Sequence, residues 1–185
     1  GLQYLGLNYW AALLVVPLLQ HSGQPAEPCV SEGERVYKGQ LIALPAGLGA
    51  AVHAPSSGIV QRIGAAPCPH ASGQTFTAIE IATDGKDEWH PDIQPADPAS
   101  LDDEQLLQRI RQAGISGMGG AGFPAATKLH SGQQSSIDTL IINGTECEPY
   151  ITADDMLMRE RAAAIVAGSA MLQRLLQARQ VVFAI

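Results

Sequence analysis

Five glycines fall within the first nine residues of the stretch GISGMGGAGFPAATKL, at residues 114–129. Glycine adopts positive φ angles at no steric cost and leaves its backbone N–H groups open to a close ligand. Several such N–H groups ahead of a helix N-terminus form an anion site, and phosphate is the anion we expect. Lys128 lies about one turn into the expected helix, where its ammonium group would reach that phosphate. The alternative is a tight structural loop between packed helices.

The glycine-rich loop departs from two common nucleotide-binding patterns. It is not a P-loop, because no Gly-Lys-Ser/Thr sequence closes it. It also differs from a Rossmann fingerprint, since its spacing is G-x-G-G-x-G and a helix rather than a strand is predicted before it. The loop on its own therefore leaves both the phosphate site and the structural loop open.

A second group of polar residues follows the predicted strand IDTLIIN, at residues 137–143. Asn143, Glu146 and Glu148 come just past the carboxyl end of this strand, where α/β sheets place their ligands. The amide of Asn143 can donate and accept hydrogen bonds, which suits the edge of a planar heterocycle. Cys147 has acidic neighbours that would not stabilise a thiolate, so we do not expect a nucleophile there. The alternative is a turn with solvated acids.

Helical and strand patterns alternate around these two motifs. Ser100 and Asp103 resemble a capping box, Gly114 is a natural helix stop, and Pro124 suits a first helical turn. The expected elements are a helix over 101–113, a helix from 124, a buried strand over 137–143, a helix over 154–178 and a second buried strand over 181–185. This order predicts an α/β domain with a parallel sheet. Parallel sheets usually have more strands, so we expect an incomplete domain and a chain that is a fragment of a longer protein.

Residues 28–85 predict an all-β module, with short apolar runs separated by turn signals. The patterns G-x-x-V-x-K-G-Q at 33–40 and A-P-x-x-G-x-V at 54–60 resemble the biotinyl/lipoyl-like barrel-sandwich family. Carriers of that family bear their cofactor on a hairpin lysine, and the corresponding hairpin at 44–52 has none. A structural module is therefore the better interpretation, and Lys38 is expected to be solvated in a turn.

The remaining segments and the composition set further limits. The apolar run from Tyr9 to Leu19 is too short to span a bilayer, so residues 1–27 are expected to hold a buried strand or helix. The alternative is a membrane-associated or non-native segment. Residues 86–100 contain three prolines and are predicted to form a linker or an irregular crossing. The long helix over 154–178 is expected in the core, because its charges would be unfavourable in lipid.

Composition argues against several classes of protein. The 185 residues are 46% hydrophobic and 16% charged, as in a globular protein. The net charge is −7 and no basic stripe is present, so we expect no nucleic-acid partner. The three scattered cysteines form no zinc pattern and no disulfide framework. His53 and His70 lack partners at ligand spacing, so no metal site is predicted.

The two polar motifs together are more specific than either one. G-x-G-G-A-G-F-P-x-x-x-K followed by N-x-x-E-x-E-P resembles the flavin site of the NADH-binding flavoprotein subunit of respiratory complex I. The sequences GGAGFPAATKL, LIINGTECEPYITADDMLMRE, QHSGQPAEP and APSSG resemble the C subunit of the Rnf (Rsx) ion-translocating electron transport complex still more closely. The resemblance covers roughly residues 17–185, whereas residues 1–16 do not look like the usual start of that family.

This resemblance implies a β-rich barrel-sandwich module followed by an incomplete Rossmann-like α/β flavin-binding domain that begins near residue 101. It assigns the FMN phosphate and ribityl chain to four glycines, namely Gly117, Gly119, Gly120 and Gly122. Lys128 would support the phosphate, Asn143 would bond the isoalloxazine edge, and Glu146 and Glu148 would border the flavin and the NAD(H) pocket. No acid–base or nucleophilic catalytic residue is required, because the cofactor carries the chemistry.

The family also implies a role for the parent protein. It would be an NAD(H)-linked oxidoreductase and translocase subunit, peripheral to the cytoplasmic face of the bacterial inner membrane. Its partners would be other membrane subunits and a ferredoxin-like or iron–sulfur electron partner. The cysteine-rich segment that holds two 4Fe–4S clusters in full-length members is absent from these 185 residues. The alternative is a non-enzymatic scaffold with a purely structural glycine loop, and a biotinyl-type carrier is a third, weaker alternative.

Overall fold

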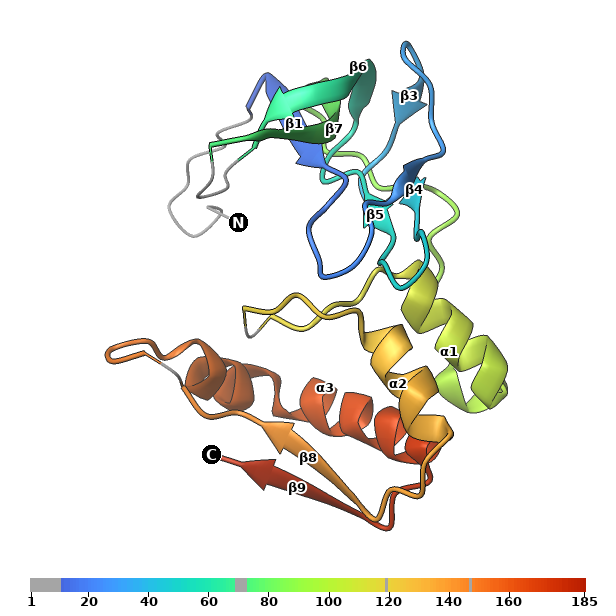
Figure 1. Ribbon diagram of the computed structural model, residues 1–185, viewed down its shortest axis with the longest axis vertical. Helices are drawn as coiled ribbons and strands as arrows, with labels where there is room; N and C mark the ends of the chain where they lie inside the picture. Colours follow the sequence, from blue (N-terminus) through green and yellow to red (C-terminus); the bar gives the residue numbers. More distant parts are fainter. Residues whose placement is uncertain (1–10, 69–72, 119, 147) are drawn as a thin grey trace. The chain divides into compact units, whose positions relative to one another are not determined.

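The computed structural model describes residues 11–68, 73–118, 120–146 and 148–185. The chain divides into two compact units, drawn with their elements in Figure 1. The first comprises the residues up to Ala96 together with Arg109–Ala125, and the second comprises Asp97–Gln108 together with Ala126–Ile185. The glycine-rich loop therefore belongs to the same unit as the β module.

The first unit contains two antiparallel sheets, which confirms the predicted all-β module. The larger sheet has the strand order β1-β7-β6-β3 and the smaller one the order β2-β4-β5. The strands are β1 (Leu13–Pro17), β2 (Glu27–Pro28), β3 (Arg35–Val36), β4 (Leu41–Leu44), β5 (Val52–His53), β6 (Gly58–Pro67) and β7 (Thr75–Thr83). Strand β1 lies ahead of residues 28–85 and pairs with β7 from Leu13↔Ala82 to Pro17↔Ala78.

The core of the first unit forms between these sheets from side chains that alternate along each strand. Val36, Ile42, Val60, Ile79 and Ile81 are all fully buried. Successive residues of a strand point to opposite faces, so apolar residues at every second position reach one core. Each such aliphatic side chain stabilises the fold by about 1.5–3 kcal/mol relative to an exposed one.

Part of the apolar run near the N-terminus forms the strand β1, and a strand was one of the two structures predicted for this run. Val16 and the following Leu18 are buried, whereas Leu13 and Val15 of the same strand are exposed. Residues 1–10 lie outside the described part of the chain. No helix among the described residues is long and apolar enough to cross a membrane.

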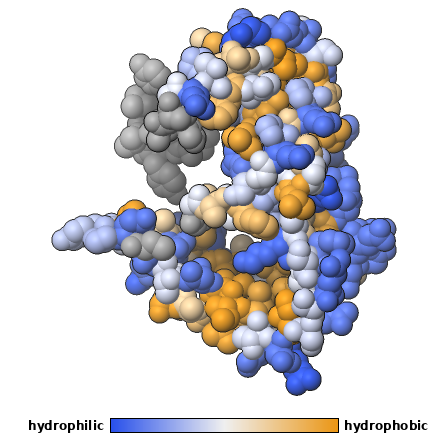
Figure 2. Space-filling view, viewed as in Figure 1, coloured by the Kyte–Doolittle hydropathy of each residue, from blue (hydrophilic) through white to orange (hydrophobic). Residues whose placement is uncertain are grey.

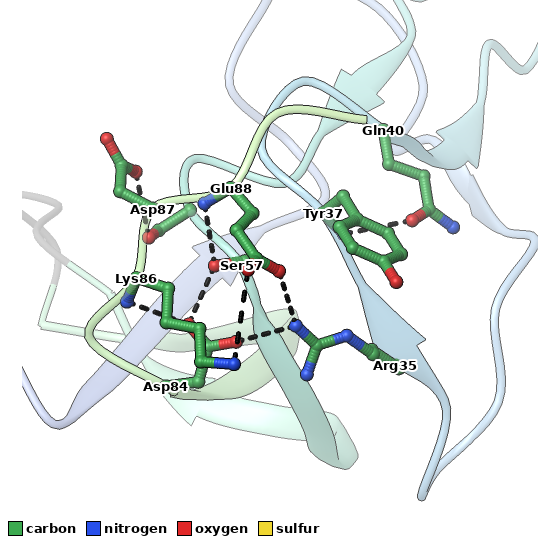
Figure 3. Close-up of polar contacts among 9 residues, drawn as sticks. Arg35, Tyr37, Gln40, Ser57, Asp84, Lys86, Asp87 and Glu88 are labelled. Carbon is green, nitrogen blue, oxygen red and sulfur yellow. Dashed lines mark hydrogen bonds and ion pairs between the residues drawn. The ribbon is translucent and has the colours of Figure 1, made fainter. Parts of the chain in front are cut away.

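A network of charged and hydroxyl side chains holds the segment after β7 against the strands (Figure 3). Arg35 donates to Asp84 at 2.9 Å and to Glu88 at 2.8 Å, and the buried Ser57 hydroxyl donates to Asp84 at 2.7 Å. The prediction of a solvated Lys38 is wrong. Its ammonium lies 2.5 Å from the Asp87 carboxylate and 4.9 Å from the centre of the Trp89 ring, because the segment after β7 returns across this turn.

The second unit follows the predicted order of helices and strands. It contains the 3₁₀ helix η2 (Pro98–Ser100), α2 (Ala125–Gln133), β8 (Thr139–Asn143), α3 (Ala153–Leu176) and β9 (Gln180–Ala184), and α1 (Asp103–Gln112) begins in it. Strands β8 and β9 are parallel, in register from Thr139↔Gln180 to Asn143↔Ala184, and α3 packs against both. The predicted parallel sheet is therefore confirmed.

The start of each short helix differs in detail from its prediction. The capping box of α1 is formed by Asp102 and Gln105, whose side chains each accept the other's backbone N–H at 2.8 and 3.0 Å. Ser100 instead donates its hydroxyl to Asp97, so the predicted Ser100–Asp103 box is wrong. The reason is that η2 occupies residues 98–100 and delays α1. Pro124 immediately precedes α2 and lies outside its first turn.

Apolar side chains are exposed on the two-stranded sheet. Figure 2 shows a hydrophobic patch over β8 and β9. Ile141 is 62% exposed, and Val182, Phe183 and Ile185 are also exposed. The prediction that both strands are buried is therefore wrong, because neither strand contains a buried residue. Arg174 near the end of α3 bonds the Asp103 carboxylate at 2.8 Å and the Leu101 carbonyl at 2.5 Å.

Candidate functional site

The glycine-rich loop is a closed hairpin whose base is made by backbone hydrogen bonds. The Gly117 N–H donates to the Phe123 carbonyl, and the Ala125 N–H donates to the Ile115 carbonyl, both at 2.8 Å. Ser116 and Pro124 pair between these two bonds. The N–H of Gly117 is thus engaged within the loop, and any ligand must be bound by N–H groups nearer the tip.

The tip of the loop is fixed by Ser22, a residue of the QHSG turn that follows β1. The Ser22 N–H donates to the Gly122 carbonyl at 2.9 Å, and its hydroxyl donates to the Ala121 carbonyl. Gly122 has a φ of +58°, and a Cβ added there would lie 3.2 Å from the His21 Cα. Only glycine meets both demands without strain.

Sequence reasoning did not identify Ser22 as part of this site. The QHSG turn precedes the loop by 99 residues at the Ser22–Ala121 bond. The two segments share no local pattern that would relate them. The one local signal was the QHSG turn itself, a short polar turn that comes shortly after an apolar run.

A groove of about 480 Å³ runs beside the tip of the loop. Gly120, Ala121 and Gly122 line one side, and residues 20–22 and Phe76 line another. Gly120 has a φ of +96° and open space where its Cβ would be. Of the predicted phosphate-binding glycines, Gly117, Gly120 and Gly122 therefore lie in one loop, and Gly119 lies outside the described residues.

The hairpin at 44–52, which corresponds to the lysine-bearing hairpin of carrier proteins, contacts the segment before the glycine-rich loop. Arg111 of that segment donates to the Gly47 carbonyl at 3.2 Å. The hairpin also contacts the QHSG turn, where Nε2 of His21 accepts the Ala50 N–H at 2.9 Å. Gly114 has a φ of +65°, and a Cβ there would collide with the Ala51 carbonyl oxygen. Burial lowers the pKa of the half-buried His53 next to this contact, opposed in part by a hydrogen bond with the backbone of Gln112.

The polar residues predicted to follow β8 lie together in the connection between β8 and α3. Asn143 is the last residue of β8, and its side-chain oxygen accepts from the Thr145 hydroxyl at 2.6 Å and from the Thr145 N–H at 3.2 Å. Its amide NH₂ is the group that can serve a ligand without loss of those bonds. The Gly144 N–H donates to the Ala184 carbonyl at 2.8 Å, which ties this connection to the end of β9.

The two glutamates of this connection have different surroundings. One carboxylate oxygen of the half-buried Glu146 accepts the N–H groups of Asp154 and Asp155, at the start of α3. Glu148 is exposed, as is Lys128 on α2. The interpretation of Glu146 as a solvated acid in a turn is thus wrong, because the N-terminus of α3 lies within reach of its carboxylate.

Neither cysteine chemistry nor a metal site is evident among the described residues. No group of three His, Cys, Asp or Glu side chains in this part of the chain could hold a metal ion. Cys29 and Cys68 are free thiols, and burial raises the pKa of Cys29, with the nearby Glu34 charge adding to the effect. The expectations for Cys147 and His70 fall on positions outside the described residues.

Comparison with known families assigns a domain class to each part of the chain. Residues 9–86 match the family model described as the RnfC barrel sandwich hybrid domain. Residues 110–185 match the family model described as the Nuo51 FMN-binding domain. These matches confirm the predicted order of a barrel-sandwich module followed by a flavin-binding α/β fold. The second match includes both the glycine-rich loop and the β8–α3 connection.

Full-length relatives identify the family. The chain is 51% identical to the C subunit of the ion-translocating oxidoreductase complex of Pseudomonas aeruginosa over 92% of its length, which is 22% of that protein. It is 49% identical to the protein of the same name in Yersinia enterocolitica and 47% identical to that in Rhodobacter capsulatus. These alignments cover 93% and 94% of the chain, and 24% and 34% of the relatives. The chain belongs to this RnfC family, and it spans about a fifth to a third of the length of these relatives.

Proposed function

We propose that the chain binds FMN non-covalently, with the phosphate held by the tip of the glycine-rich loop. The observation that carries this proposal is the match to an FMN-binding domain over residues 110–185, which includes a loop fixed in an open, glycine-lined conformation. Backbone N–H groups bind phosphate well when the loop geometry is set before the ligand arrives. In this proposal the positively charged ammonium group of Lys128 also supports the phosphate.

The β8–α3 connection is proposed to contact the isoalloxazine ring. Asn143 stands at the carboxyl end of a parallel strand and can offer its NH₂ group to a ring carbonyl or nitrogen. Glu148, which is exposed, is proposed to border the flavin and the nicotinamide of NAD(H). Glu146 is proposed to act there as well, with its α3 contacts fixing where its carboxylate lies.

The whole protein is proposed to pass electrons between NAD(H), FMN and 4Fe–4S clusters in an ion-translocating complex. The name of the relatives supports an electron-transport role and other subunits as partners. Peripheral attachment at the cytoplasmic face of the inner membrane and a ferredoxin-like partner are parts of the same proposal. The protein would bind and orient FMN, and the flavin, when bound, would supply the hydride and single-electron chemistry.

Titration of the purified chain with FMN, followed by flavin fluorescence, tests the proposal. Gly120→Asp and Gly120→Asn place side chains of similar size at the same backbone conformation, and they differ in charge. We expect the aspartate to weaken FMN binding by about tenfold or more relative to the asparagine, because like charges repel in a partly desolvated site. Lys128→Met should also weaken FMN binding, whereas Lys86→Met, at an exposed lysine of the first unit, should not.

The competing function is a scaffold in which the loop is only structural. The bonds from Ser22 to the loop, and from the start of α3 to Glu146, favour it, because they show each motif engaged in packing. Equal and saturable FMN binding by Gly120→Asp and Gly120→Asn would place the phosphate elsewhere. Absence of any FMN binding by the chain and by its full-length parent would leave the scaffold as the better function.

A further inference from the structure

The QHSG turn controls the direction of two peptide groups in the glycine-rich loop. Ser22 bonds the carbonyls of Ala121 and Gly122, through its hydroxyl and its N–H respectively. A trans peptide group is planar, and its C=O and N–H bonds point in opposite directions. The N–H groups that share these two peptide planes belong to Gly122 and Phe123. Both therefore point away from the QHSG turn.

These two N–H groups are available to a ligand. Neither one donates a backbone hydrogen bond within the part of the chain that the structure describes. The N–H of Gly117 and that of Ala125 are, in contrast, engaged at the base of the loop. Two adjacent N–H groups that point the same way form a concave donor pair of the kind that binds phosphate oxygens.

The QHSG turn is itself held firmly by the β module. The Ala50 N–H donates to the His21 ring at 2.9 Å, and the Ala26 N–H donates to the Leu18 carbonyl at 2.9 Å. Leu18, just ahead of the turn, is only 1% exposed. Ser22 thus lies in a turn whose neighbouring residues are bonded to the β module and packed in the core of the first unit.

We propose that Ser22 is a positioning residue, through which the β module orients the Gly122 and Phe123 N–H groups for phosphate. This inference rests on the proposed FMN binding for its ligand. In this proposal the barrel-sandwich module does not carry a cofactor on a lysine. Instead, the module fixes the geometry of the glycine-rich loop, which lies nearly one hundred residues further along the chain.

The test compares two flavins and three variants of the 185-residue chain. Ser22→Ala removes the hydroxyl bond to Ala121, Ser22→Thr retains a hydroxyl, and Ser31→Ala is a control at an exposed serine of the same unit. Riboflavin has the ring and ribityl chain of FMN but lacks the phosphate. We expect Ser22→Ala to weaken FMN binding about 3- to 10-fold and to leave the Kd of riboflavin unchanged. Ser22→Thr and Ser31→Ala should match the parent with both flavins.

Hydrogen exchange of the Gly117 amide, measured by NMR without flavin, gives a readout that does not depend on the proposed function. Gly117 donates to Phe123, so a loosened loop should raise its exchange rate about threefold or more in Ser22→Ala. If the parent binds neither flavin, the proposed function fails, and this rate alone decides the inference. Unchanged exchange in Ser22→Ala would then overturn it. Equal loss of FMN and riboflavin affinity, or no loss of either, would also overturn it.

Discussion

The carboxylate of Glu146 accepts a hydrogen bond of 2.6 Å from the backbone N–H of Asp154, at the start of α3. The same oxygen accepts the N–H of Asp155 at 3.1 Å. Thr152, the residue at the usual capping position, makes no side-chain bond to the helix. A carboxylate here satisfies two N–H groups that have no partner within the helix and interacts favourably with its dipole. Glu146 therefore stabilises the second unit independently of any flavin.

Glu146→Ala is expected to lower the free energy of unfolding of the second unit by about 1–2 kcal/mol, as for the loss of other helix caps. Glu146→Gln should have a smaller effect, since its amide oxygen can still accept both bonds. Urea unfolding followed by circular dichroism at 222 nm measures the difference. Glu148→Ala, at an exposed site two residues further on, is the control and should change stability by less than about 0.5 kcal/mol. Equal effects of the two alanine variants would contradict the capping role.

Local patterns in the sequence predicted the elements of the second unit because each element follows from short-range periodicity. The apolar run that ends in Asn143 forms β8, and the helix expected from residue 154 begins at Ala153. The predicted strand from residue 137 begins two residues later, because the Asp138 carbonyl accepts the N–H groups of Arg179 and Gln180 outside the β8–β9 register. The exact start of a strand depends on where its partner strand pairs with it, and a local sequence pattern holds no information about that partner.

The contacts that define the candidate site were beyond the reach of local patterns. Ser22 contacts Ala121 across 99 residues, and Glu146 reaches Asp154 across a turn whose path is set by the packing of α3. Lys38 was predicted to be solvated because its partner, Asp87, lies in a segment whose sequence shows neither helical nor strand periodicity. In each case the residue type was visible in the sequence, and tertiary structure chose its partner.

Gly114→Ala is expected to destabilise the first unit strongly. The φ of +65° at this residue imposes strain on any residue with a Cβ, and that Cβ would meet the carbonyl oxygen of Ala51. Strain and clash together should cost about 2–4 kcal/mol. Gly85→Ala separates the two effects, since Gly85 has a φ of +72° and nothing within 4 Å of an added Cβ. It should cost only about 1 kcal/mol. Thermal and urea unfolding of the two variants would show the difference, and equal losses would mean that the hairpin at 44–52 does not pack on Gly114.

His53 is expected to make the stability of the first unit depend on pH near neutrality. Burial lowers the pKa of His53 below its ordinary value of 6.5, so the folded chain excludes a proton that the unfolded chain binds. Stability therefore rises with pH between the lowered pKa and 6.5, and it falls as the pH is reduced from 7 through this window. Urea unfolding at pH 7.5 and 5.5 should show a smaller loss for His53→Gln than for the parent. His130→Gln, at an exposed histidine, should behave like the parent.

Ser57 is expected to control the ionisation of Asp84. Its buried hydroxyl donates to the Asp84 carboxylate at 2.7 Å, and this bond is the chief reason that the pKa of Asp84 lies below 3.8, ahead of the Lys86 N–H and of Arg35. A carboxylate with a lowered pKa stabilises the fold above its unfolded pKa, and this contribution is lost as the pH falls through the folded value.

The pair of adjacent buried serines provides a matched test, drawn in part in Figure 3. Ser57→Ala removes the donor to Asp84, whereas Ser56→Ala removes a bond of 3.0 Å to a different carboxylate, that of Asp87. NMR titration of the Asp84 carboxyl carbon should show its pKa rising toward 3.8 in Ser57→Ala and staying low in Ser56→Ala. Acid unfolding of Ser57→Ala should begin at a higher pH than that of the parent. An unchanged Asp84 titration in Ser57→Ala would assign the lowered pKa to Arg35 and the Lys86 N–H instead, and Arg35→Met would then raise it.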